Sequence, residues 1–257
     1  MSFIDAIILG IVEGLTEFLP ISSTGHLILA STLLGLKQGG FQKTFEIVIQ
    51  LGAILSVIFL YFERLKRDGA LWIRIVTAFI PTGVVGFVLY KIIKHYLFSP
   101  YVVVVSLAIG GVVIILLELY FKRRKATILD PAQLGYKQAL FIGLVQSLAV
   151  IPGTSRSAST IIGGMLAGMD RKSAVEFSFL LAIPTMFAAT GYDMLKTGFS
   201  LTAHQWALIG TGFVVSFFSA VLAIKAFIAF VSRFTLIGFG FYRILAAAAF
   251  FLTVLHR

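Results

Sequence analysis

Residues 10–26 of the chain read GIVEGLTEFLPISSTGH. Glu13 and Glu17 are four residues apart, which places them on one face of a predicted helix, and Pro20 ends that helix. A group of hydroxyl residues and His26 follows at once. Because the surroundings are apolar, this stretch predicts a helix interrupted at membrane depth, which a bilayer tolerates only where the break is buried in protein or lines a wet cavity.

A second stretch, residues 143–157, reads GLVQSLAVIPGTSRS and repeats the first about 130 residues later. The segment 45–47 (Phe-Glu-Ile) likewise has a counterpart in 175–177 (Val-Glu-Phe). The two interrupted regions, 1–35 and 134–169, contain helical pieces of roughly 12–18 residues, which are too short to cross a bilayer. Each region therefore predicts a re-entrant helix-loop-helix hairpin.

The composition assigns the whole chain to the membrane. Of its 257 residues 59% are hydrophobic and 12% charged, and the mean hydropathy is +1.00, whereas soluble domains have about 25% charged residues. We expect an all-α polytopic protein forming a single membrane domain over residues 1–257. The six predicted transmembrane helices cover about 45–62, 71–90, 101–121, 174–195, 204–230 and 234–255.

Each half of the chain thus has one broken hairpin followed by three spans. Repeat one covers about 1–125 and repeat two about 134–257. Because three is odd, the second copy enters the bilayer upside down relative to the first, which is the inverted-topology repeat known from transporters.

The 21 Lys and Arg exceed the 11 Asp and Glu, and their placement predicts the orientation. The positive-inside rule puts the richer end, side one, in the cytoplasm, with anionic headgroups rather than nucleic acid as the partner of this charge. Side one carries Arg64, Lys66, Arg67, Lys122, Arg123, Arg124, Lys125, Lys137, Arg171, Lys172 and Arg233. Side two carries both termini and Lys37, Lys43, Lys91, Lys94, Lys196 and Arg257. The absence of Cys excludes thiolate metal sites, and the first 20 residues lack the basic start of a cleaved signal peptide.

Glu13 and Glu17 repel each other unless a cation, a basic group or a shared proton relieves them. Oxygen ligands of this kind suit a hard divalent cation, Mg²⁺ or Ca²⁺. The alternative is a pair of glutamates that faces water at a helix end. The apolar segment favours the functional interpretation, since ionisable groups at membrane depth are costly.

The Ser22-Ser23-Thr24-Gly25-His26 segment joins the two pieces of the first hairpin. One hydroxyl suffices to cap the following helix. His26 is three residues after Ser23, and a serine beside histidine and glutamate is the usual arrangement of an activated nucleophile with its proton acceptor. We therefore expect Ser23 as nucleophile and His26 as acid or base, with Ser22 and Thr24 binding substrate.

The second hairpin supplies an arginine where the first supplies acids. A guanidinium at mid-bilayer requires an anion, so Arg156 either forms a structural salt bridge with Glu17 or binds substrate. Two helix N-termini that converge on the centre, together with the fork of Arg156, would form a phosphate site. Thr154, Ser155 and Ser157 are its expected neighbours.

Four further polar residues lie inside or at the start of predicted spans. Glu46 and Glu176 occupy equivalent places in the repeat, where a carboxylate favours the helix N-terminus. Gln50, one turn after Glu46, is a candidate to join Glu46 in the central site. For Arg243, a structural ion pair and a role in steering substrate both stay open.

The segments Glu13–His26 and Pro152–Ser157 resemble the bacterial undecaprenyl-diphosphate phosphatase family of the bacitracin-resistance type, and the similarity runs over nearly the whole chain. One departure is Ala158, where the family usually has glycine. The resemblance implies a hydrolase of the bacterial cytoplasmic (inner) membrane that removes the terminal phosphate of undecaprenyl diphosphate on the outer, periplasmic side and recycles the carrier lipid for peptidoglycan synthesis. It also implies that Glu13 and Glu17 form the acidic motif, Ser23 the nucleophile, His26 the acid or base and Arg156 the diphosphate clamp.

The alternative function is a transporter or flippase for an anionic polyprenyl lipid, since inverted repeats with broken helices are typical of transporters. The membrane lipid phosphatases that use two histidines are disfavoured, because only His26 lies near a motif. Oligomeric state, including a homo-oligomer, metal identity and the choice between a phosphoserine and a metal-activated water stay open.

Overall fold

The chain is all-α in a computed structural model that describes residues 1–36, 39–96, 99–122, 125–197 and 201–255. Ten α-helices lie in these ranges: α1 (Phe3–Thr16), α2 (Ser23–Leu33), α3 (Gly40–Arg67), α4 (Gly69–Tyr96), α5 (Pro100–Phe121), α6 (Tyr136–Gln146), α7 (Arg156–Leu166), α8 (Arg171–Thr197), α9 (Ala203–Val231) and α10 (Ile237–Phe250). Two short 3₁₀ helices, η1 (Pro131–Gln133) and η2 (Ser147–Val150), and a π-helical turn, η3 (Phe251–Leu255), complete the set.

Five of these helices are long and apolar enough to cross a membrane, so the chain is a polytopic membrane protein. They are Gly40–Arg67, Gly69–Leu89, Tyr101–Phe121, Arg171–Tyr192 and Ala203–Val231. The predicted sixth span, 234–255, is shorter than expected. A turn occupies its first residues, α10 has 14 residues, and the helical structure continues through the π-helical turn to Leu255.

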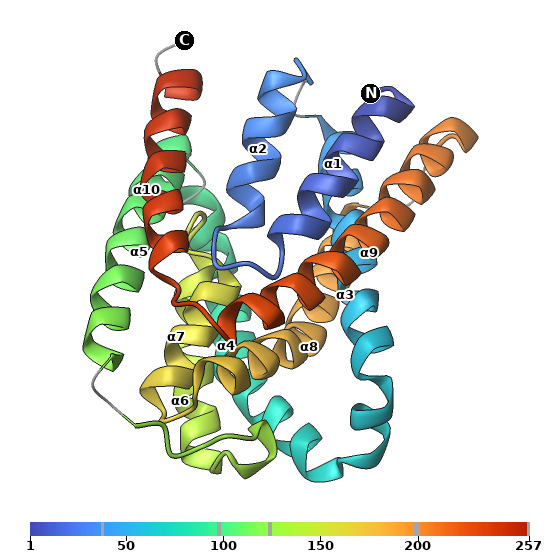
Figure 1. Cartoon of the computed structure of the whole chain (residues 1–257). Coiled ribbons are helices and arrows are strands. Elements are labelled where there is room, and N and C mark those ends of the chain that lie inside the picture. The colour runs from blue at the N-terminus through green and yellow to red at the C-terminus, as the bar shows by residue number, and fades with distance from the viewer. Residues whose placement is uncertain (37–38, 97–98, 123–124, 198–200, 256–257) are drawn as a thin grey trace.

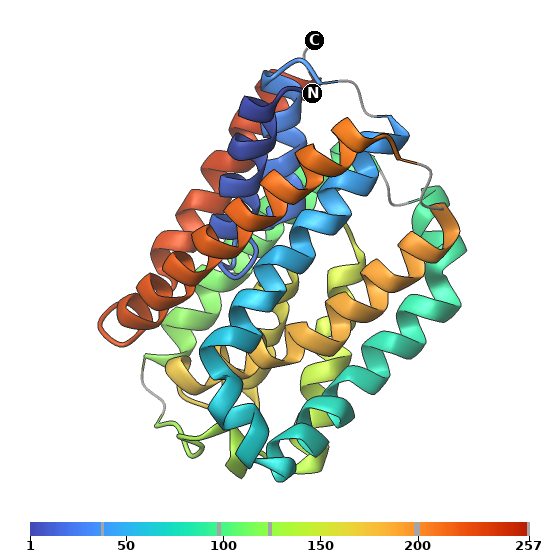
Figure 2. The same ribbon diagram turned by 90° about the vertical axis from the view of Figure 1, so that its right-hand side faces the viewer.

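Two helical hairpins approach the middle of the molecule from opposite ends (Figure 1). α1 and α2 descend from the end that carries both termini, and their connection, Glu17–Ser22 (tip one), lies near the centre. α6 and α7 come from the other end, joined by Ser147–Ser155 (tip two). Figure 2 shows the long helices α3, α8 and α9 crossing beside them.

Glycines allow each hairpin to approach a long helix closely. α1 packs on α9, where a Cβ atom on Gly10 would lie 2.7 Å from the carbonyl oxygen of Gly212. α6 packs on α4, where a Cβ atom on Gly143 would overlap the carbonyl oxygen of Ala78. Gly10 and Gly143 are the first residues of the two repeated segments, so the repeat in the sequence corresponds to a repeated packing contact.

The apolar core surrounds the tips. Phe18 is fully buried in tip one, and its ring packs edge-on against Phe179 of α8 with centroids 5.3 Å apart. Phe179 in turn contacts Phe227 of α9. These rings fill the space beside tip one with side chains that exclude water.

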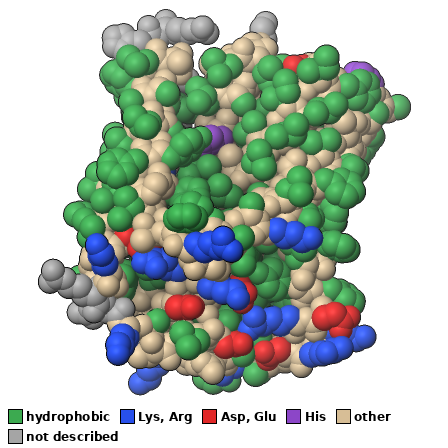
Figure 3. Space-filling model, viewed as in Figure 1, with side chains coloured by type: hydrophobic (Ala, Val, Ile, Leu, Met, Phe, Trp, Pro, Cys, Tyr) green, Lys and Arg blue, Asp and Glu red, His purple; other side chains and the backbone are tan. Residues whose placement is uncertain are grey.

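The charged residues gather at the end opposite the termini, as the band at the lower end of Figure 3 shows. There Arg171 binds Glu118 through two N–H groups, and Arg64 pairs with Glu176 at 2.9 Å and with Asp130. The sequence predicts that Glu176 stabilises a helix N-terminus. In the structure its carboxylate forms an ion pair with Arg64. Lys37, Arg123, Arg124 and Arg257 lie outside the described residues, as do the side chains of Lys91, Lys94 and Lys196.

The close contact of α6 with α4 gives a first prediction. Gly143→Ala should destabilise the folded protein by about 1–3 kcal/mol, because the new methyl group meets backbone rather than a movable side chain. Thermal unfolding of the purified protein in detergent measures this. Gly210→Ala in α9 is the control, since a Cβ atom there meets nothing within 4 Å. Equal unfolding temperatures for the two variants would contradict the prediction.

Candidate active site

The two tips are joined by direct polar contacts. Arg156 at the start of α7 donates to Glu17 of tip one with an N–O distance of 2.9 Å, and its other terminal nitrogen donates to the carbonyl oxygen of Ser178 at 2.9 Å. The Ser157 hydroxyl donates to the carbonyl oxygen of Leu19 at 2.7 Å. The salt bridge that the sequence left as one alternative for Arg156 is therefore present.

Both tips end in a serine with left-handed backbone. Ser22 (φ 70°) and Ser155 (φ 73°) are the non-glycine residues with positive φ in the described chain, and each immediately precedes a helix. A conformation of this kind costs energy and clusters at functional sites. It places Ser23 and Arg156 at the same position, the first residue of α2 and of α7.

The two helix starts differ in their caps. The Ser155 hydroxyl accepts from the amide of Ala158 at 3.2 Å, whereas no side chain caps α2. The first amides of α2, from Ser23 to Gly25, accordingly have no hydrogen-bond partner among the described residues. The N-terminus of α2 therefore has free donors for an anion.

Ser23 is hydrogen-bonded to a glutamate. Its hydroxyl donates to Oε2 of Glu17 at 2.5 Å, and Oε1 of the same carboxylate accepts from Arg156. Both side chains are buried, with residue exposures of 8% for Ser23 and 7% for Glu17. The Ser23 hydroxyl, the Glu17 carboxylate and the Arg156 guanidinium thus form one continuous series of hydrogen bonds.

His26 lies on the same turn but bonds elsewhere. Its Nδ1 is 2.8 Å from the carbonyl oxygen of Ser22, and its Nε2 is 2.7 Å from the hydroxyl of Tyr242. A carbonyl can only accept, so Nδ1 carries the proton and Nε2 accepts from Tyr242. The two rings are stacked with centroids 5.5 Å apart. Neither ring nitrogen is hydrogen-bonded to Ser23, so the expected acid or base is not in contact with the expected nucleophile.

Glu13 forms no salt bridge among the described residues. It is completely buried in α1, and neither carboxylate oxygen has a hydrogen-bond partner in the described structure. Glu17, one turn along the helix, and Glu46 repel its charge, whereas Arg156 attracts it. The described residues contain no group of three or more acidic, His or Cys side chains that could hold a metal. A cation here would need hydroxyl, amide, water or substrate oxygens beside the two glutamates.

A cavity of about 260 Å³ lies between the tips. That volume far exceeds the roughly 10–15 Å³ that one water requires, so a polar headgroup can enter. Its polar lining consists of Glu17, Ser22, Ser23, Thr24, Gln50, Ser155 and Arg156. Thr154 and Ser157, also expected here, do not line it: the Thr154 carbonyl accepts from Arg243, and the Ser157 hydroxyl bonds to Leu19. Glu46 also lies apart, bonded to Gln42 at 2.8 Å.

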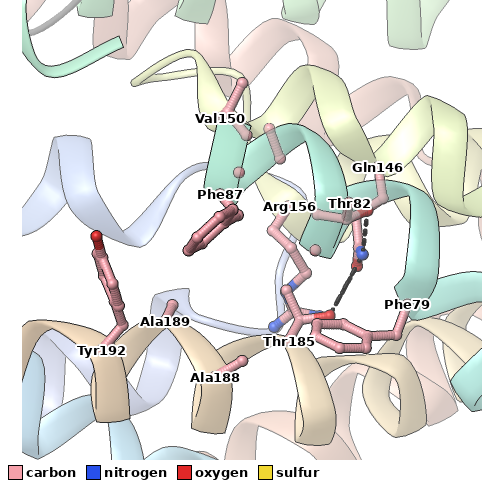
Figure 4. Close-up of a pocket in the computed structure, with 13 residues that line it drawn as sticks. Phe79, Thr82, Phe87, Gln146, Val150, Arg156, Thr185, Ala188, Ala189 and Tyr192 are labelled. Carbon is pink, nitrogen blue, oxygen red and sulfur yellow. Dashed lines mark hydrogen bonds between the residues drawn. The ribbon is translucent and has the colours of Figure 1, made fainter. Parts of the chain in front are cut away.

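A second cavity, of about 410 Å³, shares Ala149, Arg156 and Ala189 with the first. Figure 4 shows the residues that line this second cavity. Its walls are mostly apolar side chains of α4 and α8, among them Phe79, Phe87 and Tyr192. Phe87 is 76% exposed, so this cavity lies at the outer face of the helices. Arg156 lines both cavities and reaches into the second, as Figure 4 shows.

Sequence reasoning missed several residues that contact the site. Tyr242 bonds to His26, and Ser178 and Met186 contact the guanidinium of Arg156. Tyr242 precedes Arg243 within an apolar helix, and this polar pair was the signal that could have identified it. A backbone carbonyl such as that of Ser178 leaves no signal in the sequence.

The comparisons with known proteins agree over nearly the whole chain. The family model described as "Bacitracin resistance protein BacA" matches residues 6–249. An undecaprenyl-diphosphatase of Persephonella marina is 58% identical, covering 99% of this chain and 100% of its own length. Those of Wolinella succinogenes and Aquifex aeolicus are 54% and 55% identical, covering 97% and 96% of this chain and 97% and 98% of their own lengths. The chain therefore belongs to the family of the bacitracin resistance protein BacA.

Proposed function

We propose that this chain is an undecaprenyl-diphosphatase, a membrane hydrolase that converts undecaprenyl diphosphate into undecaprenyl phosphate and inorganic phosphate. The relatives named above carry this activity in their names. The observation that carries the proposal is the hydrogen-bonded chain from Ser23 through Glu17 to Arg156, which lines a cavity of headgroup size.

The reaction begins with attack by Ser23. Its Oγ forms a bond to the terminal phosphorus while the bond from that phosphorus to the bridging oxygen breaks, and undecaprenyl phosphate leaves. The Ser23 proton passes to Glu17, which already accepts a hydrogen bond from it at 2.5 Å. Glu17 gives that proton to the leaving phosphate oxygen and is a carboxylate again. Water then attacks the phosphoserine while Glu17 takes a proton from it; the P–Oγ bond breaks, Glu17 returns the proton to Ser23 Oγ, and inorganic phosphate is released. Direct attack by a metal-activated water stays the alternative.

Arg156 and the start of α2 hold the diphosphate. The Nε of Arg156 is buried and has no partner among the described residues, so it has a donor left for a phosphate oxygen. The free amides of α2 supply further donors on the other side of the cavity. Stabilisation of charge by preorganised donors is the main requirement of phosphoryl transfer. Among the hydroxyls, Ser22, Thr24 and Ser155 are placed to contact the substrate.

His26 holds the backbone of tip one in place through a hydrogen bond. Its bond to the Ser22 carbonyl supports the strained residue directly before Ser23. Tyr242 fixes the imidazole from the other side at 2.7 Å. His26 therefore contributes to catalysis by orienting the nucleophile, and Glu17 accepts the proton.

The polyprenyl tail occupies the apolar cavity between α4 and α8. This cavity shares Arg156 with the polar one, so a diphosphate on the tip side continues into an apolar chain on the lipid side. The tail needs little more than this lateral opening, because the bilayer is already its preferred solvent.

The acidic residues fit a divalent cation. The two carboxylate oxygens of buried Glu13 are available as ligands, and Glu17 is the second carboxylate. Mg²⁺ or Ca²⁺ held by these glutamates and completed by substrate oxygens would neutralise the diphosphate. The ion pair of Glu17 with Arg156 orients that carboxylate.

The architecture we propose is an inverted repeat within one membrane domain, residues 1–257. α1–α5 form repeat one and α6–α10 form repeat two, with two re-entrant hairpins and six transmembrane helices, α10 being the sixth. The matching glycine contacts of α1 with α9 and of α6 with α4 support this two-fold relation. The basic band supports a cytoplasmic position for the end opposite the termini, and hence a site that opens to the periplasmic side.

The activity is tested on purified protein in detergent, where transport is impossible. We expect release of inorganic phosphate from a polyprenyl diphosphate. Binding of the lipid without phosphate release would favour the alternative of a transporter or flippase. Expression in a bacitracin-sensitive strain, with growth in bacitracin as the readout, tests the resistance role.

Covalent catalysis predicts that Ser23→Ala binds substrate almost normally and loses turnover by roughly three orders of magnitude or more. Substrate binding and phosphate release by the same preparation measure the two effects. Arg156→Ala is the contrast, because it should weaken binding and rate together. Near-normal turnover of Ser23→Ala would eliminate the covalent mechanism.

A divalent cation at Glu13 predicts that chelation abolishes phosphate release and that Mg²⁺ or Ca²⁺ restores it. Glu13→Gln should raise the cation concentration for half-maximal activity by roughly 10–100-fold. Glu63→Gln is the matched control, because Glu63 is 68% exposed and pairs with Arg67. The same cation dependence in both variants would exclude Glu13 as a ligand.

A further inference from the structure

Arg243 of α10 is a fully buried arginine, with a relative exposure of 0%. Each of its N–H groups donates to a backbone carbonyl oxygen, so the guanidinium uses all of its donors. The acceptors are Pro20 at 3.2 Å, Gly153 at 3.0 Å, Thr154 at 3.1 Å, Ser106 at 3.1 Å and Leu107 at 3.3 Å. None of these acceptors is a carboxylate, so the structural ion pair, one of the two alternatives for Arg243, is absent from the described contacts.

The acceptors belong to three separate segments. Pro20 lies in tip one, Gly153 and Thr154 lie in tip two, and Ser106 and Leu107 lie in α5. One planar group thus connects both tips to the α5–α10 pair. A single nitrogen, Nη1, donates to tip one and to tip two at once.

The surrounding backbone is shaped to this side chain. Gly110 of α5 leaves no room for a Cβ atom, which would overlap the guanidinium of Arg243. Gly153 has φ +90°, and a Cβ atom there would lie 2.6 Å from the carbonyl oxygen of Val103. Tip two therefore turns sharply against α5, and its carbonyl groups face Arg243.

We propose that Arg243 is the positioning residue that sets the separation and orientation of the two tips, and thereby the distance between Ser23 and Arg156. This inference rests on the proposed function. Ser23 follows Pro20 by three residues, and Arg156 follows Thr154 by two. A misplacement of reacting groups by about 1 Å can cost roughly 100-fold in rate. The neighbouring Tyr242 also helps to position tip one, because it bonds to His26, which in turn bonds to Ser22.

The bonding pattern requires arginine. Lysine keeps the charge but has three donors on a single nitrogen, so it cannot reach acceptors spread over a planar fork. Methionine fills a similar volume without donors or charge. The expected order of activity is therefore wild type, then Arg243→Lys, then Arg243→Met.

The kinetic test uses folded, monodisperse protein in detergent and a polyprenyl diphosphate as substrate. Arg243→Met should lower kcat/KM by roughly 100-fold, with a higher KM and a weaker inhibition by inorganic diphosphate. Arg74→Met is the control, because Arg74 also donates to backbone carbonyls, those of Leu134 and Ala70, away from the tips. It should keep the wild-type KM.

A structural role alone would lower the fraction of active protein and leave KM and the inhibition constant unchanged. That result for Arg243→Met would overturn the proposal, as would full activity. If Arg243→Met does not fold, Arg243→Lys takes its place, with a raised KM expected and an unchanged KM contradicting the proposal.

A distance measurement tests the proposal without substrate. The chain has no native Cys, so spin labels can be attached at Thr24→Cys and Ile151→Cys, one on each side of the cavity. Pulsed electron resonance should give a narrow distance distribution that broadens when Arg243→Met or Arg243→Lys is added. An unchanged distribution would overturn the positioning role. A wild-type protein without hydrolytic activity would instead refute the proposed function, and the distances would still test Arg243.

Discussion

The ion pair between Glu17 and Arg156 is the contact on which the rest of the site depends. It joins two residues 139 positions apart in the chain, at an N–O distance of 2.9 Å, in surroundings where both side chains are mostly buried. Neither charge can be held singly at such a place without a large cost. Each hairpin therefore supplies the opposite charge that stabilises the charge on the other. The cavity lies where the two tips meet.

The same apolar surroundings that demand this pairing also favour the chemistry. A hydrogen bond or ion pair is stronger where water is excluded, and the Phe18 and Phe179 rings exclude it on one side of the site. Three described residues have buried side-chain polar atoms without a hydrogen-bond partner, Glu13, Arg156 and Ser216; the first two lie at the site, where a cation and a phosphate would satisfy them. A phosphoryl group that enters the cavity would thus meet donors that are already in place.

Much of this arrangement could be predicted from the residues. Pro20 and Pro152 marked the interrupted helices, and the cost of an intramembrane charge selected Glu13, Glu17 and Arg156. The sequence could not reveal contacts made through the backbone: Arg243 bonds only to carbonyl groups. It also left open which of His26 and Glu17 bonds to Ser23, because spacing along a helix places His26 nearby without fixing which way its ring turns; the described hydrogen bond is to Glu17. The predicted last span starts at 234, three residues before α10, because the turn before this helix contains the apolar residues Phe234 and Leu236.

The most direct test of the shared site is an experimental structure with a non-hydrolysable diphosphonate analogue of the lipid. The account predicts the terminal phosphorus within about 3.5 Å of Ser23 Oγ, a near-attack separation, with Arg156 Nε bonded to a phosphonate oxygen and the alkyl chain directed between α4 and α8. An analogue bound to one tip alone, with Ser23 and Arg156 in separate cavities, would contradict it.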